Sequence, residues 1–421
     1  MKLNRLLVPF SSRNYRLFFS GQIASLVGNW MTQTATVWLV YHLTGSAFWL
    51  GLVSFLGQIP IVLLAPVSGV CVDRFNRLNI LRLAQVLAML QSLALAACAL
   101  TGIINVRWLI GLAIFQGVIN AFDMPARQAI VVQLVNRRED LPGVIGLNSS
   151  VFNFARLVGP GLAGLLIDSA GVGYCFLIDG LSFAPVLVAL GLIRVTPHRR
   201  DEPGLSVWSE FSAGLRYALG FGPIRQLILT TACFTVFGLS YGVLIPVIAR
   251  VTFGGDAKLL GMLMSAVGVG AVLAALYLAT RSGAKGLSKV IVSGAVILGL
   301  ALPVIAFSQN LALTLACLLL CGGGQILILA TTNTLLQNLV DEQKRGRVLS
   351  LYGLAFLGGW PLGSLLTGTV ADHLGLTAAM VLCGAATLFI AWLFHRQLPA
   401  FRRQIRAVLA PKVDVPSSVV E

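Results

Sequence analysis

The chain has 421 residues, of which 57% are hydrophobic and only 11% are charged, and its formal net charge is +15. A water-soluble core cannot absorb many apolar runs of about 20 residues, the length with which a helix crosses the roughly 30 Å of hydrocarbon in a bilayer. The composition therefore excludes an ordinary soluble protein and predicts an all-α integral membrane protein, since such runs without period-2 alternation also exclude barrel strands.

Twelve apolar runs are predicted to span the membrane as helices. They cover residues 17–42, 48–71, 79–103, 107–131, 144–168, 172–193, 223–248, 258–280, 286–308, 311–336, 347–371 and 375–395. The first run is too long for a signal peptide, contains Gln22, Asn29 and Gln33, and has no small-residue cleavage site. We therefore expect it to remain as the first span.

Basic residues indicate which end of each span is cytoplasmic. Of the 30 Lys and Arg residues, all but Arg107, Arg156, Arg250 and Lys258 lie in or beside alternate connecting segments or the two termini. Positive residues concentrate on cytoplasmic loops, so both termini are predicted to be cytoplasmic in a multi-pass protein of the plasma (inner) membrane. The net charge is then a topology signal and an attraction to the lipid bilayer, and no nucleic acid is expected as a partner.

The segment G-V-C-V-D-R-F-N-R, between the second and third spans, places one acid and two arginines between apolar runs. Gly69 permits the close approach of another helix, and Asp73 can accept hydrogen bonds from a helix N-terminus or an arginine. Arg74 and Arg77 are expected to hold the loop on the cytoplasmic face.

Charged residues within spans are costly and therefore informative. Arg156 in the fifth span lies roughly 18 Å deep, and Asp123 in the fourth roughly 12 Å deep, by the helical rise. We expect them to pair or to exchange partners, with Arg127 competing for Asp123 at i, i+4, although a static ion pair would explain the same spacing. Protonation of Asp123 would free Arg156 to hold an acidic group of a substrate. Asp179 in the sixth span is a second titrating site or a residue at the lip of a cavity.

The fifth span contains N-F-A-R-L-V-G-P-G-L-A-G. Gly159 and Pro160 are expected to bend the helix and remove a backbone hydrogen bond, while Gly161 and Gly164 permit a close helix crossing.

Other polar residues within the spans are candidates to line a central cavity, or else to bridge helices. They are Gln22, Asn29, Gln33, Gln58, Asn120, Asn153, Gln325 and Asn333. Aromatic side chains that could contact a ring-bearing substrate are Trp30, Trp38, Phe55 and Phe115.

A long polar interruption divides the spans six and six. The predicted parts are an N-terminal six-helix bundle (1–195), a cytoplasmic linker (196–222), a C-terminal six-helix bundle (223–397) and a cytoplasmic tail (398–421). The linker is either an interfacial helix, with Val207, Trp208, Phe211, Leu215 and Leu219 on one face, or a plain charged connection. G-P-G-L-A-G-L-L-I-D (159–168) aligns with G-S-L-L-T-G-T-V-A-D (363–372), and Gly51 matches Gly261, which indicates a duplicated half.

These motifs together resemble the major facilitator superfamily. The loop G-x-x-x-D-R-x-x-R resembles the family's signature loop, although Leu78 and Asn79 follow it instead of further basic residues. The resemblance implies that Gly69, Asp73, Arg74 and Arg77 form a latch that braces the two halves on the cytoplasmic side when the transporter faces outward. The fifth span resembles the family's exporter motif, with Ala163 and Gly164 in place of the usual Gly-Gly pair.

Segments around the fifth span narrow the resemblance further. F-D-M-P-A-R-Q-A (122–129), R-E-D-L-P-G-V-I-G-L-N-S-S (138–150) and L-I-D-G-L-S-F (177–183) are similar to the exporter branch that holds the enterobactin (siderophore) and macrolide efflux proteins. This resemblance implies twelve helices in the major facilitator fold and the export of an amphipathic organic small molecule.

Several other function classes are disfavoured by the sequence. It has no G-x-x-x-x-G-K-[ST] loop for ATP and no metal-ligand or C-x-x-C spacing, so neither a cofactor nor enzymatic activity is expected. The prediction is a monomeric secondary transporter that exports a siderophore-like or drug-like molecule by alternating access, with proton antiport as its energy source. The alternatives are an uptake permease or lipid flippase of the same fold and, less favoured, a polytopic membrane enzyme.

Overall fold

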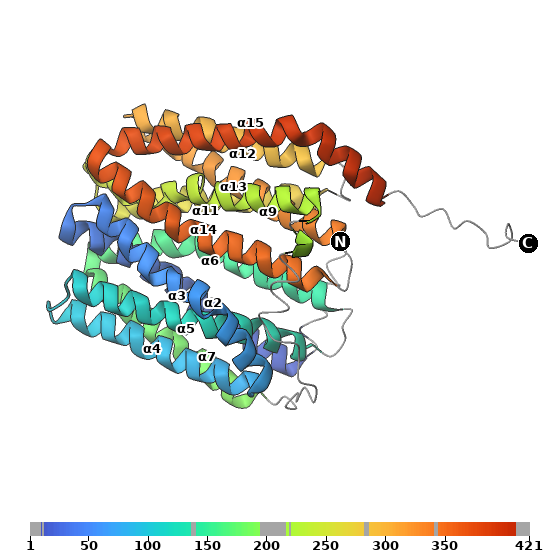
Figure 1. The fold of residues 1–421 in the computed structure, drawn as a ribbon. Helices are drawn as coiled ribbons and strands as arrows, with labels where there is room; N and C mark the ends of the chain where they lie inside the picture. Colours follow the sequence, from blue (N-terminus) through green and yellow to red (C-terminus); the bar gives the residue numbers. More distant parts are fainter. Residues whose placement is uncertain are drawn as a thin grey trace, which may run out of the picture.

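The computed structural model describes residue 10 and residues 12–135, 140–193, 216–218, 220–281, 286–340 and 344–409, and this described part contains helices and no β-strand. Its long helices run side by side in one bundle (Figure 1). In chain order they are α2 (Arg13–Thr44), α3 (Ala47–Arg74), α4 (Arg77–Leu100), α5 (Val106–Gln133), α6 (Leu141–Ala170), α7 (Val172–Leu192), α9 (Gly222–Phe237), α11 (Ala257–Ala279), α12 (Leu287–Phe307), α13 (Leu311–Leu339), α14 (Arg345–Leu374) and α15 (Leu376–Leu409).

Eleven helical segments among the described residues are long and apolar enough to cross a membrane. They correspond to the second to twelfth predicted spans, with ends shifted by a few residues in most cases. The remaining long helix, α2, has 32 residues but is not among the eleven. Polar side chains such as Gln22, Asn29 and Gln33 interrupt its apolar run, and it packs against α6 and α7.

Polar caps fix where several helices begin. Asn105 Oδ1 accepts hydrogen bonds from the backbone N–H groups of Arg107 and Trp108 at the start of α5. Asp256 and Asn310 cap α11 and α13 in the same way. Such caps satisfy N–H groups that have no partner within the helix, so the short connections between spans are defined by single side chains.

The predicted span 223–248 is not one continuous helix. After α9 the chain forms a 3₁₀ turn, η3 (Ser240–Leu244), a short α10 (Ile245–Val247) and a π-helical turn, η4 (Ile248–Thr252). Gly238 and Gly242 have low helix propensity, and Pro246 cannot donate a hydrogen bond to the preceding turn. The interruption places Tyr241 and Gly242 in the wall of the central cavity.

Helix pairings in the first half recur in the second. The pairs α3–α5, α4–α7, α2–α7 and α2–α6 correspond to α11–α13, α12–α15, α9–α15 and α9–α14. Figure 1 shows α4 and α7 at one side of the bundle and α12 and α15 at the other. The same arrangement of helices is therefore built twice, as expected from the aligned sequence segments.

The two sets of helices meet mainly through α6 against α11 and α3 against α14. We call the end of the bundle where α2 begins and α15 finishes the terminal end, and the opposite end the far end (Figure 1). Near the far end a Cβ added to Gly51 would lie 2.5 Å from the Ser364 carbonyl oxygen, and one added to Gly261 would lie 2.5 Å from that of Pro160. Only glycine permits backbones this close, so the far end is closed by two glycine crossings.

Most of the predicted linker lies outside the described residues. The five apolar residues of its proposed interfacial face, from Val207 to Leu219, are all outside the described residues.

The last helix continues past residue 395, where the span was predicted to end, and α15 reaches Leu409. Leu398 and Phe401 are buried there, so part of the predicted tail packs as helix on the bundle.

Candidate functional site

A cavity of about 880 Å³ lies between the two sets of helices. Its described lining runs from Val132 and Leu141, at the terminal end of α5 and α6, to Pro160 and Ser364, beyond the middle of α6 and α14. The far end is closed by the glycine crossings. The cavity is therefore a deep pocket that approaches the terminal end only.

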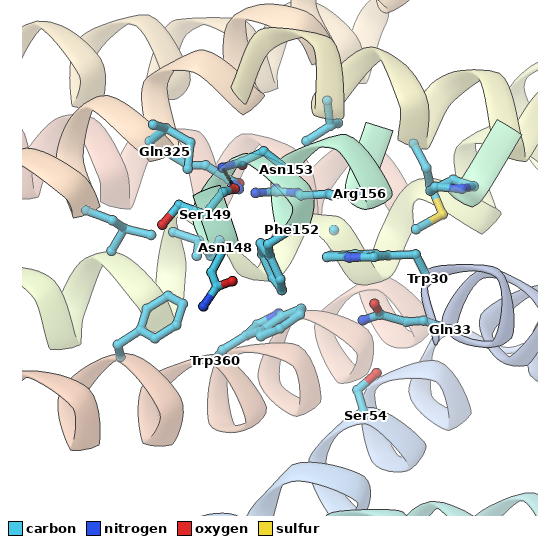
Figure 2. A pocket seen from close by; sticks show the side chains of 18 of the residues that line it. Trp30, Gln33, Ser54, Asn148, Ser149, Phe152, Asn153, Arg156, Gln325 and Trp360 are labelled. Carbon is cyan, nitrogen blue, oxygen red and sulfur yellow. Dashed lines mark hydrogen bonds between the residues drawn. The ribbon is translucent and has the colours of Figure 1, made fainter. Parts of the chain in front are cut away.

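Aromatic side chains from both halves form its apolar walls. Trp30 on α2 and Phe152 on α6 pack edge to face with ring centroids 5.7 Å apart. Phe356 and Trp360 line the cavity from α14, and Tyr241 lines it from η3. Figure 2 shows Trp30, Phe152 and Trp360 around a common space. Concave apolar walls with a few polar groups are typical of small-molecule sites.

Arg156 lies halfway along α6 and lines this cavity. With the Gln325 amide oriented so that its oxygen faces the guanidinium, Arg156 donates hydrogen bonds to Gln325 Oε1 on α13 from Nη1, over 2.9 Å, and from Nη2. The guanidinium carbon also lies 5.8 Å from the centre of the Trp30 ring. Figure 2 shows the arginine extending toward Asn153 and Gln325.

Asp123 does not pair with Arg156, contrary to the expected contact. Asp123 is buried on α5 and forms a two-point ion pair with Arg127, one helical turn away, with hydrogen bonds of 3.0 Å from Nε and from Nη2. Gln85 Nε2 donates to Asp123 Oδ1 over 2.6 Å, and Arg127 Nη1 donates to Gln22. Arg127 and Gln85 therefore satisfy this acid, and Arg127, the expected competitor, holds it, while Gln22 accepts a hydrogen bond from the arginine.

Asp179 on α7 is buried away from the cavity, between α2 and α4. Ser92 Oγ on α4 donates to Asp179 Oδ2 over 2.8 Å. Asp179 Oδ1 makes no hydrogen bond with a described group, although the Thr32 hydroxyl lies nearby. A Cβ added to Gly28 of α2 would lie 2.8 Å from this oxygen. Asp179 is thus a buried acid between helices, not a residue at the cavity lip.

The fifth-span motif meets both a neighbour in its own half and the other half. α6 stays helical through Pro160, and Gly159 faces α2 at Trp30, where an added Cβ would lie 2.5 Å from that of Trp30. A Cβ added to Gly161 would lie 3.2 Å from Ser265 Oγ of α11, and Gly164 faces Ala257 and Gly261 at the far-end crossing. The predicted close crossing is therefore with α11.

The loop predicted to act as a latch is open in this conformation. Asp73, whose side chain is 56% exposed, lies 3.6 Å from Arg77 in an i, i+4 ion pair. A Cβ added to Gly69 would meet nothing within 4 Å, so the expected close helix approach at this glycine is absent here. Arg74 ends α3 and is exposed. The terminal end is where the cavity separates the halves, and no helix of the described part of the chain packs closely on Gly69 there.

Three of the eight predicted cavity-lining residues line the cavity, namely Gln33, Asn153 and Gln325. Gln22 belongs to the Asp123 cluster, while Asn120 and Asn333 accept hydrogen bonds from glutamines one turn away on their own helices. Asn29 and Gln58 are not part of the lining. Of the four predicted aromatic residues, Trp30 alone lines it.

Several lining residues were not among the predicted sites. They include Ser54, Gln128, Ser149, Phe152, Tyr241, Phe356 and Trp360. On α6 the spacing 145, 148, 149, 152, 153, 156 and 160 follows one helical face, so extending the face through Arg156 would have found the residues of this helix. For Tyr241 no periodic signal exists, because it lies in the interrupted segment. Among the described residues no group of three or more His, Cys, Asp or Glu is arranged to hold a metal ion.

The chain is similar to known families and proteins along most of its length. The sequence profile of a family described as transmembrane secretion effector matches residues 5–417. The staphyloferrin A transporter of Staphylococcus aureus is 28% identical over 385 residues, covering 90% of this chain and 95% of its own. The multidrug efflux pump Tap of Mycolicibacterium fortuitum is 28% identical over 381 residues, covering 86% and 92%.

Solved structures share the fold at low identity. A POT family transporter in complex with 5-aminolevulinic acid has a TM-score of 0.71 at 13% identity, covering 93% of this chain and 97% of its own. A bacterial homologue of the human lysosomal transporter Spinster, solved in an inward-facing and unoccupied conformation, has a TM-score of 0.65 at 15% identity, covering 97% and 98%. These likenesses show that the chain shares the fold of these transporters.

Proposed function

The chain belongs to the transmembrane secretion effector family of the major facilitator type, and from this premise we propose that it is a secondary active exporter of amphipathic organic small molecules. Its family and relatives are transporters and not enzymes. Siderophore-like or drug-like molecules are the cargo classes that the names of the relatives support.

The observation that carries this proposal is the cavity between the two sets of helices. It is about 880 Å³, it approaches the terminal end, and glycine crossings close the far end. Rocking the two halves about this site would close the terminal end and open the far end, which is alternating access. The described conformation would then be the one that loads cargo from the terminal side.

The proposed topology has twelve spans, with α2 as the first. The polar residues of α2 lower its mean hydropathy, so it is not among the eleven apolar helices. Its length and its packing against α6 and α7 nevertheless suit a span whose polar face lies within the bundle. The alternation of basic loops supports cytoplasmic termini, hence an inward-open conformation in the plasma (inner) membrane. We treat the two six-helix bundles, residues 1–195 and 223–397, as the rocking units of a monomer.

Roles for the motif residues follow from this cycle. Gly69, Asp73, Arg74 and Arg77 would engage the other half only when the terminal end closes, which agrees with their freedom in the open conformation. Acids enclosed by the bundle are the sites that can bind a coupled proton.

Proton antiport is the proposed energy source, with the buried acids Asp123 and Asp179 as the groups that bind protons. Asp123 forms an ion pair with Arg127, which lines the cavity, so protonation of the Asp123 carboxylate would release the arginine. Asp179 has one hydroxyl donor and no cation among the described residues.

The test uses vesicles into which the purified chain is reconstituted in the inverted orientation. Siderophore, macrolide and dye cargoes are offered outside, with and without an imposed proton gradient that makes the vesicle lumen acidic. Gradient-driven accumulation of a cargo supports a proton-coupled exporter. Protein-free vesicles and vesicles treated with a protonophore are the controls.

The same assay distinguishes the alternatives. Accumulation only in right-side-out vesicles would indicate uptake, and movement of a labelled lysophospholipid between leaflets would indicate lipid flipping. Equilibration of cargo with no response to the gradient would contradict proton antiport and leave a facilitated transporter.

A further inference from the structure

The charge balance of the cavity is positive. Its described lining contains two charged side chains, Arg127 and Arg156, and no Asp or Glu. Arg127 is offset by Asp123, which accepts two hydrogen bonds from its guanidinium. The net charge presented to a bound molecule therefore comes from Arg156.

Arg156 has no carboxylate partner among the described residues, whose Lys and Arg ion pairs are Asp73–Arg77 and Asp123–Arg127. Its hydrogen-bond partner, Gln325, is neutral, its guanidinium lies over the Trp30 ring, and Tyr241 of η3 also lies near its charge. A guanidinium has five N–H donors in a planar fork, so the two hydrogen bonds to the Gln325 oxygen leave donors available. An arginine halfway along a membrane-spanning helix is costly unless an anion or water compensates it.

We propose that the cargo is an organic anion whose carboxylate, or an equivalent pair of oxygens, binds the guanidinium of Arg156 while its ring system packs against Trp30, Phe152 and Trp360. This inference rests on the proposed transport function and names the chemical class of its substrate. The two halves contribute to the site together, since Arg156 belongs to α6 and Gln325 and Trp360 belong to α13 and α14.

The geometry favours a carboxylate over a cation of the same shape. A planar guanidinium and a carboxylate match in two parallel hydrogen bonds, which are stronger than neutral ones. Asn153 of α6 and Gln33 of α2 add polar groups to the described lining. A cationic molecule in this space would meet Arg156 with no acid in the described lining to offset the repulsion.

Two dyes of opposite charge test this proposal. Fluorescein and rhodamine 123 share a three-ring xanthene with a pendant phenyl ring. Fluorescein carries a carboxylate on that ring, whereas rhodamine 123 carries its methyl ester and a cationic xanthene. Binding to the purified full chain in a neutral detergent is measured by fluorescence anisotropy at pH 8. We expect fluorescein to bind about 10-fold more tightly, or better.

Variants of the arginine assign the preference to one side chain. Arg156→Gln is expected to weaken fluorescein binding about 10-fold and to leave or improve rhodamine 123 binding. Arg156→Lys keeps the charge but loses the fork, so it should retain an intermediate preference. Arg107→Gln, the same change at an exposed position at the far-end start of α5, is the matched control and should change neither affinity.

A wild-type competition experiment covers the case in which Arg156→Gln does not fold. 2-Naphthoate should displace fluorescein at about a tenth of the concentration that its neutral amide, 2-naphthamide, requires. Equal potency of the two competitors, equal or tighter binding of rhodamine 123, or an unchanged dye ratio in a folded Arg156→Gln chain would overturn the proposal. These binding assays need no gradient, so their outcome does not depend on whether the chain transports cargo. Conversely, export of a cationic cargo and not of an anionic one in vesicles would refute the anion preference and leave the transport function intact.

Discussion

Asp123 and Arg127 share one turn of α5, and Arg127 lines the cavity while Asp123 is buried behind it. Asp123→Asn would leave the Arg127 guanidinium without its counter-charge in a largely enclosed site. Breaking one side of a buried pair costs about 3 kcal/mol, because the remaining charge is uncompensated. We expect the apparent melting temperature of the detergent-purified chain to fall by several degrees.

A double-mutant cycle separates this pair from a general packing defect. Arg127→Gln in the Asp123→Asn background removes the orphaned charge, so the double variant should recover part of the lost stability. A double variant less stable than either single one would show that the two side chains do not act as a pair. Export rates of the same variants would report separately on proton coupling.

Asp179 differs from Asp123 because no cation accompanies it among the described residues. Asp179→Asn keeps the shape and the hydrogen bond from Ser92 but removes the proton-binding group. If Asp179 carries the coupled proton, this variant should fold normally and still equilibrate cargo, while gradient-driven accumulation falls at least about 10-fold, the loss expected when a single charge-dependent step is removed. Vesicle accumulation with and without the gradient measures both terms.

Ser92→Ala is the matched control for that experiment, since it removes the donor and leaves the carboxyl group. It should retain coupling, although the pH at which transport is half-maximal can move. Undiminished accumulation by Asp179→Asn would assign Asp179 a structural role between α2, α4 and α7.

At the scale of helices, the sequence predicted where most spans lie because a bilayer-length apolar run admits one regular solution. It missed the interruption after α9, since Gly238, Gly242 and Pro246 lie within an otherwise uniform apolar run and glycine and proline are tolerated in many membrane helices. Trp360 was missed for a different reason. Hydropathy gives no information on which face of a helix meets a cavity instead of lipid.

The candidate site shows the same limit. Arg156 was singled out because its depth alone makes it costly, and it lines the cavity, but its partner was not predictable from depth. Asp123 is nearer in sequence to Arg127 on the same helical face, and the local pair forms. Gln325 approaches Arg156 from a helix more than 150 positions later, a contact that follows only from the packing of the two halves.

The glycine crossings give a prediction for the helix pairs that close the far end. Gly51→Val adds a branched side chain where a Cβ alone would lie 2.5 Å from the Ser364 carbonyl of α14. α3 and α14 must then separate, which favours the conformation open at the far end. Ser149→Cys, in a chain without its seven native cysteines, places a thiol in the cavity for labelling by a membrane-impermeant maleimide.

In right-side-out vesicles, Gly51→Val should increase the labelling of Cys introduced at position 149, and in inverted vesicles it should decrease it. Gly111→Val is the matched control, because a Cβ at Gly111 on α5 meets nothing within 4 Å. Equal labelling of the Gly51→Val and Gly111→Val chains from the far side would mean that the crossing does not hold that end closed.

For the whole molecule, the proposed transport cycle requires the two ends to exchange roles. The described conformation has its close helix crossings at the far end, while at the terminal end the ion-pair partner of Asp73 among the described residues is its own neighbour on the chain, Arg77. Removing an interaction that exists in one conformation shifts the population toward the other. Asp73→Asn should therefore leave the stability of the described conformation unchanged within about 0.5 kcal/mol, as for exposed ion pairs, and should reduce the population open at the far end.

Gly51→Val and Asp73→Asn are thus expected to act in opposite directions on one equilibrium. Their free-energy effects should add, because the two positions lie at opposite ends of α3 and share no partner. Labelling at position 149 from the far side should be high in Gly51→Val, low in Asp73→Asn and close to the wild-type value when both changes are combined. If the double variant instead labels like Gly51→Val alone, then Asp73 has no part in closing the terminal end, and the latch must be sought in other residues of that face.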